Sequence, residues 1–273
     1  MTKEQKQELK QALEQKDWWS VGQVRNLVKA QYGVSYGKRQ MQRILRQLGL
    51  YCYKPQPRDY RQPEKADEKL KERLRAVADA LGLKGKDLDK LCIGFADETS
   101  PQLYSNSARL WSTRKGLLKK VNTDKKRRNS FGFYALKGNS IIASIGKGNQ
   151  ETMLRMLTLI RQANPQAQTI ILIWDNHSAH LTPLVEQTAK DLQIVLVNLP
   201  PYSPNLNPIE RIWKQIKKTI SEAGTIENLI QLEHLIQSAF KECAQKLSFA
   251  KSWIEKVWNQ VFENNPIPFS DKL

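Results

Sequence analysis

The chain has 273 residues, 40% hydrophobic and 26% charged, so it can bury a sizeable core and is not a disordered tail. It contains no apolar run long enough to span a bilayer, its first twenty residues lack the apolar core of a secretory signal, and three widely separated cysteines exclude a disulfide framework. The 44 lysines and arginines outnumber 27 aspartates and glutamates, and this net charge of +17 favours a polyanionic partner.

The positive charge is concentrated in two segments. Residues 1–61 hold 13 basic and 5 acidic side chains, and residues 109–128 hold 9 basic and 1 acidic. A solvated surface would explain one such cluster. Two clusters in different structural contexts favour nucleic acid as the partner.

Residues 1–53 predict a helix-turn-helix DNA-binding module. Apolar residues at helical spacing predict one helix over residues 3–16, a second that begins after Ser20, and a third that runs from Ser35 to Gly49. Residues 50–53 are expected to form a strand that would serve as a wing. The polar face of the third helix would contact DNA through Lys38, Arg39, Gln42, Arg43 and Arg46. A plain three-helix bundle with a basic exterior is the alternative.

Residues 54–64 hold three prolines and three basic residues, which is typical of an extended, semi-rigid linker. Arg58 and Arg61 would allow this linker to follow a DNA backbone. Residues 64–81 then read as a charged amphipathic helix that leads into a second domain. We expect that domain to span residues 65–263 and a tail to occupy residues 264–273.

The second domain alternates strands with helices. Buried helices are expected over residues 149–163, after Asn176 to about Lys190, after Glu210, and twice in the last fifty residues. The expected strands are Leu91–Ala96, Arg109–Ser112, Phe131–Lys137, Ser140–Ile145, Thr169–Trp174 and Gln193–Leu199. This order predicts an α/β fold with a mixed sheet.

Three carboxylates stand at the points where ligands gather in such folds. Asp97 and Asp175 each follow an apolar strand, and Glu210 lies in the first turn of a later helix. If the two strands are neighbours, the three side chains converge. Carboxylates that converge without basic partners repel one another, and divalent cations such as Mg²⁺ relieve that repulsion. Two such ions would support an in-line phosphoryl transfer.

Each carboxylate also has a purely structural interpretation. An aspartate after a strand is often a turn former, and Asn207 to Glu210 fits a capping box with Pro208 at the first helical position. His177 and His180 beside Asp175 could suggest zinc, but no third soft ligand is near in the sequence. His180 is instead expected to orient this loop or to meet DNA.

Two segments carry a resemblance to a known family. Leu172-Ile-Trp-Asp-Asn-His-Ser-Ala-His180 and Leu199-Pro-Pro-Tyr-Ser-Pro-Asn-Leu-Asn-Pro-Ile-Glu-Arg-Ile-Trp213 leave 34 residues between Asp175 and Glu210. Together with Phe95-Ala-Asp-Glu98 and Trp111-Ser-Thr-Arg-Lys-Gly116, they resemble the DDE transposases of the Tc/mariner superfamily, in the bacterial insertion-sequence branch. The resemblance runs from about residue 18 to residue 260.

This resemblance implies a ribonuclease-H-like catalytic domain with two Mg²⁺ or Mn²⁺ ions held by Asp97, Asp175 and Glu210, while Glu98 is not counted as a ligand. It implies cut-and-paste transposition, usually into a TA dinucleotide, by a homodimer acting on double-stranded DNA: the terminal inverted repeats and the target. A bacterial cytoplasm, at the nucleoid, is the expected location. Further DNA contacts are expected from Arg114 and Lys115, and from Arg211 and Lys214 on the helix after Glu210, for which a solvated face is the alternative.

The family usually carries two helix-turn-helix units before the catalytic domain, and this sequence has room for one clear unit. A downstream reading frame or a truncated copy would account for that. The competing hypotheses for function are a decayed or repurposed copy that only binds DNA, and a ribonuclease-H-like nuclease of another kind. The presence of all three carboxylates favours an active transposase over a decayed copy, and the DNA-binding module together with the proline-rich block disfavours a nuclease of another kind.

Overall fold

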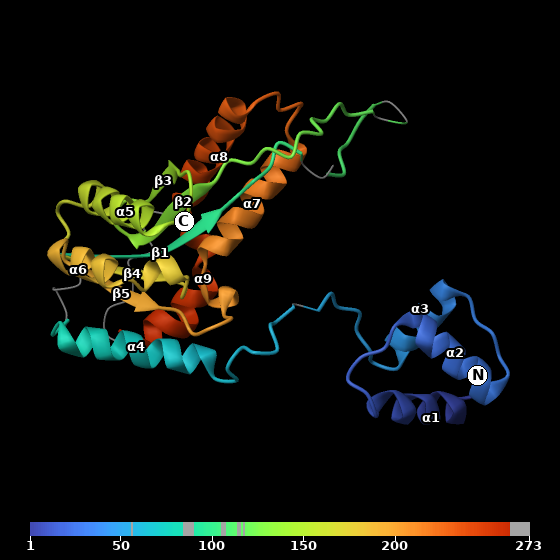
Figure 1. Cartoon of the computed structure of the whole chain (residues 1–273). Coiled ribbons are helices and arrows are strands. Elements are labelled where there is room, and N and C mark those ends of the chain that lie inside the picture. Colours follow the sequence, from blue (N-terminus) through green and yellow to red (C-terminus); the bar gives the residue numbers. More distant parts are fainter. Residues whose placement is uncertain (56, 84–89, 105–107, 114–115, 117, 263–273) are drawn as a thin grey trace. The chain divides into compact units, whose positions relative to one another are not determined.

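The computed structural model (Figure 1) describes residues 1–262 except residues 56, 84–89, 105–107, 114–115 and 117. The expected tail, residues 264–273, lies outside the described residues. The chain divides into two units, Met1–Pro57 and Arg58–Leu273. No helix in the described part of the chain is long and apolar enough to cross a bilayer.

The first unit consists of three short helices, α1 (Lys3–Glu14), α2 (Val21–Tyr32) and α3 (Lys38–Gln47). They enclose a small core of Leu9, Leu13, Val24, Val28, Met41 and Ile44. The predicted N-cap of α2 is confirmed as a capping box, because Ser20 Oγ accepts from the backbone N–H of Gln23 and the Gln23 side chain accepts from the backbone N–H of Ser20.

The ends of α3 follow the prediction only at the C-terminus. The expected cap Ser35 is wrong: α3 starts after Gly37, whose backbone is extended and whose place at the N-cap involves no side-chain hydrogen bond. Arg25 Nε donates to the carbonyl oxygen of Tyr36, just before this start. Gly49 ends the helix as predicted, with φ +82°, a conformation that suits glycine. The N–H of Leu50 bonds to the carbonyl of Leu45, which closes a Schellman motif.

The strand expected over residues 50–53 is absent. A strand needs a neighbour for its backbone hydrogen bonds, and none of the described residues of the first unit forms one. Tyr51 and Tyr53 are instead exposed, with ring centroids 6.0 Å apart. The apolar character of this segment therefore reflects an aromatic surface and not a pleated ribbon.

The second unit is built on five strands: β1 (Leu91–Thr99), β2 (Ser130–Lys137), β3 (Ile141–Ser144), β4 (Thr169–Trp174) and β5 (Ile194–Asn198). They lie in the order β3-β2-β1-β4-β5, with β2 antiparallel to β1 and β3, and β4 parallel to β1 and β5. The predicted mixed α/β sheet is confirmed, and its arrangement is ribonuclease-H-like.

Two strand predictions differ from the structure. The strand expected over residues 109–112 is wrong, because this stretch is largely exposed, Leu110 and Trp111 included, and among the described residues it pairs with no strand. It belongs to the connection between β1 and β2, in which Lys119 donates from Nζ to the carbonyl oxygen of Ser221 in α7 at 2.7 Å. Strand β1 is longer than expected, because Asp97 and Thr99 still pair with Gly132 and Ser130 of β2.

Helices cover both faces of the sheet (Figure 1). On one face lie α5 (Gln150–Ala163) and α6 (Pro183–Asp191). On the other lie α4 (Ala66–Ala80), α7 (Ile209–Glu222), α8 (Leu229–Ala244) and a final helical segment. That segment consists of α9 (Lys251–Trp253), a π-helical turn (Ile254–Trp258) and α10 (Asn259–Val261). Strand side chains alternate between the two cores: Ile93 and Phe95 face one, Cys92 and Ala96 the other.

The caps of the first unit can be tested by stability. Ser20→Ala removes a side-chain cap and should lower the free energy of unfolding of a fragment of residues 1–57 by about 1 kcal/mol. Ser35→Ala, the matched control, should leave it unchanged, because that exposed side chain caps no helix. Urea denaturation followed by circular dichroism measures both. Equal losses in the two variants would contradict this assignment of the caps.

Candidate active site

The parallel register of β1 and β4 brings two carboxylates to one edge of the sheet. The last paired residues are Phe95 and Ile173. Asp97 and Asp175 each stand two residues beyond them, so they lie at the same level and on the same side. The sequence prediction that both aspartates gather at the carboxyl end of neighbouring strands is therefore confirmed by the register.

Helix α7 brings the third carboxylate to this edge. Its apolar stripe of Ile209, Ile212, Trp213 and Ile216 is buried against the sheet, and Glu210 stands exposed in its first turn. The capping-box alternative is not realised: within the described residues the Glu210 side chain caps nothing. Buried Asn207 instead donates from Nδ2 to the carbonyl oxygen of Ala96, 3.4 Å away, and so ties the start of α7 to β1.

Of the three carboxylates, Asp97 has the most strongly perturbed pKa. Burial raises its pKa to about 7 from an ordinary 3.8, and the negative charges of Glu210 and Asp175 add to that rise. Hydrogen bonds from the Glu98 backbone and from the Trp213 side chain act in the opposite direction but do not cancel it. No cation pairs with Asp97 in the part of the chain that the structure describes.

Asp175 is supported differently. Burial raises its pKa, but hydrogen bonds from the His180 side chain and the His177 backbone outweigh this and hold the pKa below its ordinary value. His180 Nδ1 lies 2.9 Å from Asp175 Oδ1. The His180 ring is buried and stacks on Trp174, with centroids 4.2 Å apart and planes within 5°. The prediction that His180 orients this loop is confirmed.

The pKa of Glu210 is also raised. Partial desolvation of its carboxylate raises the pKa, Lys217 lowers it, and the negative charge of Asp175 raises it. Carboxylate oxygens are the ligands that Mg²⁺ and Mn²⁺ prefer, and uncompensated negative charge attracts them, so the donor set fits a divalent cation. Among the described residues, however, no group of three or more His, Cys, Asp or Glu is already arranged around one point. The carboxylates would have to draw together to share an ion.

The proline-rich segment before Glu210 is held by the stretch that precedes α4. The Arg61 guanidinium lies 3.8 Å from the centroid of the Tyr202 ring, and its Nη1 donates to the Tyr202 hydroxyl at 3.2 Å. Gln62 donates to Asn205 at 2.9 Å. Tyr202 has φ +55°, a backbone conformation that side chains other than glycine rarely adopt, so these contacts hold a strained turn.

The expected DNA contacts lie in three places. On α3, Lys38, Arg39, Arg43 and Arg46 are exposed, and Gln42 is half-buried. Arg58 is exposed, whereas Arg61 is engaged with Asp59 as well as Tyr202. On α7, Lys214 is exposed, and Arg211 donates to the carbonyl oxygen of Phe249 at 3.4 Å. Arg114 and Lys115 lie outside the described residues.

One functional contact escapes the sequence pattern. Trp213 of α7 reads as a core residue, and it is buried, but its Nε1–H donates to Asp97 Oδ2 at 2.9 Å. In the sequence, its position three residues after Glu210 indicates that both side chains lie on one side of α7, and this could have suggested a place near the site. That spacing alone could not show which residue the indole meets.

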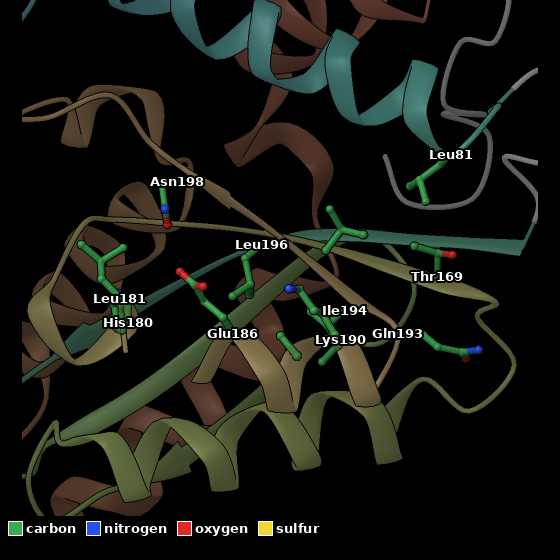
Figure 2. A pocket seen from close by; sticks show the side chains of 12 residues that line it. Leu81, Thr169, His180, Leu181, Glu186, Lys190, Gln193, Ile194, Leu196 and Asn198 are labelled. Carbon is green, nitrogen blue, oxygen red and sulfur yellow. The ribbon is translucent and has the colours of Figure 1, made fainter. Parts of the chain in front are cut away.

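A cavity of about 580 Å³ lies between α6 and β5 (Figure 2). It is bordered by the aliphatic residues of β5, by Glu186 and Lys190 of α6, and by His180. None of the three carboxylates lines it. The carboxylates instead form an open site in which Asp175 and Glu210 are exposed, and such a site admits a substrate as large as a nucleic acid backbone.

Comparisons with known proteins agree with this geometry. Residues 93–233 match the family of DDE superfamily endonucleases, and residues 15–73 match a winged helix-turn-helix family. No curated protein matches the chain. Among solved structures, the fold is similar to the Mos1 strand transfer complex, with 15% identity, a TM-score of 0.61 and coverage of 98% of this chain and 78% of that chain. The mariner Mos1 paired end complex with Mg gives 16% identity, a TM-score of 0.63 and coverage of 94% and 76%.

The contrasting environments of Asp97 and Asp175 predict opposite effects on stability. Asp97 has a raised pKa, so its ionisation destabilises the folded chain progressively as the pH rises from about 4 to about 7. Asp97→Asn should therefore melt above the wild type in EDTA at pH 8. Asp175 has a lowered pKa, so its charge contributes stability that is present at pH 8 and is lost only as the pH falls below 3.8. Asp175→Asn should melt below the wild type.

Thermal melts in EDTA at pH 4 and pH 8 measure both effects. At pH 4 the advantage of Asp97→Asn should shrink, because the wild-type carboxyl is then protonated in the folded state. A wild-type protein that melts above Asp97→Asn at pH 8 would show that this carboxylate is not an uncompensated charge.

Proposed function

The chain belongs to the family of DDE superfamily endonucleases, and we propose that it is a transposase that cleaves DNA strands and joins them to a target. The observation that carries this proposal is the convergence of Asp97, Asp175 and Glu210 at one open edge of a ribonuclease-H-like sheet. The helix-turn-helix module on the same chain, whose residues match a winged helix-turn-helix family, supplies a means of choosing the DNA.

Asp97, Asp175 and Glu210 would hold two Mg²⁺ or Mn²⁺ ions. When bound, such ions activate a nucleophile and stabilise the leaving oxygen of a phosphoryl transfer. His180 keeps Asp175 in place and ionised at neutral pH. Asn207 fixes the start of α7, and with it Glu210, against β1.

The DNA would be held by basic side chains of both units. In the first unit the exposed arginines of α3, Arg39, Arg43 and Arg46, supply charge for phosphates and guanidinium groups for base edges. In the second unit Arg211 and Lys214 follow Glu210 on α7 by one and four residues, so they lie within about one helical turn of the proposed catalytic site. Lys38, Gln42 and Arg58 are further proposed contacts. Arg114 and Lys115 are proposed as well, although they lie outside the described residues.

We propose further that the protein acts as a homodimer on the two terminal inverted repeats of its element and inserts into TA dinucleotides at the bacterial nucleoid. These features rest on the sequence resemblance to Tc/mariner transposases. A second recognition element on a partner subunit would pair the two ends before cleavage.

Removal of any one carboxylate should abolish the chemistry and spare DNA binding. Asp97→Ala, Asp175→Ala and Glu210→Ala should each lower Mg²⁺-dependent cleavage by more than roughly a hundredfold. Loss of a residue that only orients a metal ligand costs up to about a hundredfold, and loss of the ligand itself should cost more. The substrate is a supercoiled plasmid that carries the DNA flanking the coding region, and nicking is followed on gels. Arg211→Ala serves as a control that should weaken DNA binding and keep the ion site.

The outcomes separate the competing functions. A wild-type protein that binds this DNA and never cuts it would indicate a copy that only binds DNA. Cleavage without joining of the cut end to a target duplex would indicate a nuclease of another kind. Near-normal cleavage by Glu210→Ala would remove Glu210 from the site.

The DNA-binding role of α3 predicts a change in salt dependence. Replacing Arg39, Arg43 and Arg46 together by alanine should reduce the slope of log affinity against log salt by about 3, because each lost phosphate contact contributes about 0.9. Fluorescence anisotropy at several salt concentrations measures the slope with the full chain.

A triple alanine variant of Lys3, Lys6 and Lys10 on α1 is the matched control, because it removes the same net charge from another helix of the same unit. Its slope should change by less than that of the α3 variant. Identical slopes for the two variants would show that α3 is not the element that enters the groove.

A further inference from the structure

We propose that Trp213 is a positioning residue that holds the carboxylate of Asp97 for the ion, and that Gly132 exists to make room for it. This inference rests on the proposed function, because it concerns the same ion site. It assigns a role to two residues that the three-carboxylate site does not include.

The contact is direct and well shielded. Trp213 Nε1 lies 2.9 Å from Asp97 Oδ2, and the indole is only 2% exposed. Phe240 of α8 supports the other side of the ring system, with centroids 5.5 Å apart and an interplanar angle of 31°. A hydrogen bond removed from water and held by a packed ring fixes the acceptor in one orientation.

Gly132 makes this placement possible. It stands opposite Asp97 in the register of β1 and β2. A Cβ at residue 132 would lie 2.5 Å from Trp213 Cη2 and 2.9 Å from Phe240 Cε2, closer than non-bonded carbons can approach. The indole therefore occupies the space that a side chain at this strand position would fill, and any larger residue would push it away from Asp97.

The donor is also uncharged, which suits a carboxylate that is to bind a cation. An arginine or lysine at this place would neutralise Asp97 and compete with a cation. An indole N–H orients the carboxylate and carries no charge, so the negative charge remains available. Because Trp213 lies three residues after Glu210, one helix sets the position of one carboxylate and the orientation of another.

Trp253 shows that packing alone does not explain the contact. It is buried in the same core, edge-to-face against Phe95 at 4.8 Å, and its Nε1 has no hydrogen-bond partner in the described part of the chain. This core therefore accepts an indole without satisfying its N–H. Trp253→Phe is accordingly a matched control for Trp213→Phe, because each removes one buried indole.

The test measures ion binding by the full chain without any turnover. Mn²⁺ titrations followed by the rise in melting temperature should give a half-saturating concentration about tenfold higher for Trp213→Phe than for wild type. Trp253→Phe should match wild type even if both variants lose stability in EDTA. Gly132→Ala should behave like Trp213→Phe, because it displaces the indole and leaves the N–H in the protein.

An indole N–H resonance gives a second, independent readout in the wild type. In ¹⁵N-labelled protein, one of the seven indole resonances should shift both on addition of Mg²⁺ and in Asp97→Asn, and it should be missing in Trp213→Phe. If Trp213→Phe does not fold, the first two observations still decide the matter. An indole spectrum that responds to neither change would overturn the proposal.

The failure of the inference is distinguishable from the failure of the proposed function. If Asp97→Asn weakens Mn²⁺ binding and Trp213→Phe titrates like Trp253→Phe, the ion site stands and the positioning role is wrong. If Asp97→Asn titrates like wild type, Asp97 is not an ion ligand and both fail.

Discussion

The burial of the Asp97 carboxylate, beside the negative charges of Glu210 and Asp175, is the constraint on which the second unit depends. Asp97, Asp175 and Glu210 gather where β1, β4 and α7 meet, and no described cation pairs with Asp97 to offset its charge. A buried carboxylate in this position is kept there only if the surrounding fold is rigid enough to hold it. The parallel pairing of β1 with β4 and the buried face of α7 provide that rigidity from both cores of the sheet.

The two aspartates meet this constraint by different means. Asp175 is hydrogen-bonded to His180, whose ring is fixed by stacking on Trp174. This contact lowers the pKa of Asp175 and keeps its carboxylate ionised. Asp97 receives only neutral hydrogen bonds, so its charge stays uncompensated until a cation arrives. Asp175 is thus already ionised, whereas the ionisation of Asp97 is coupled to cation binding. Binding of a metal ion should therefore release a proton near neutral pH.

The elements that carry the candidate site could be predicted from the sequence because their signals are local. Apolar runs that end in an aspartate mark β1 and β4, and the proline-rich segment marks the start of α7. The failed predictions concern residues whose state depends on distant partners. Residues 50–53 and 109–112 have strand-like composition but find no neighbouring strand in the described part of the chain, and Ser35 does not cap α3 because the helix starts two residues later than expected, after Gly37. Likewise, nothing near Trp213 in the sequence reveals that its N–H faces Asp97.

Arg61 shows why charge alone does not identify a DNA contact. Counted by sequence among the basic residues of a linker, it is bound in the structure to Asp59 and to the ring of Tyr202. An arginine that already has an anion and an aromatic partner must give up both to hold a phosphate, which makes it a weaker candidate than exposed Arg58. Its present contact has another consequence. The chain enters the second unit attached to the same strained loop whose far end carries Glu210, so the linker and the third carboxylate share one support.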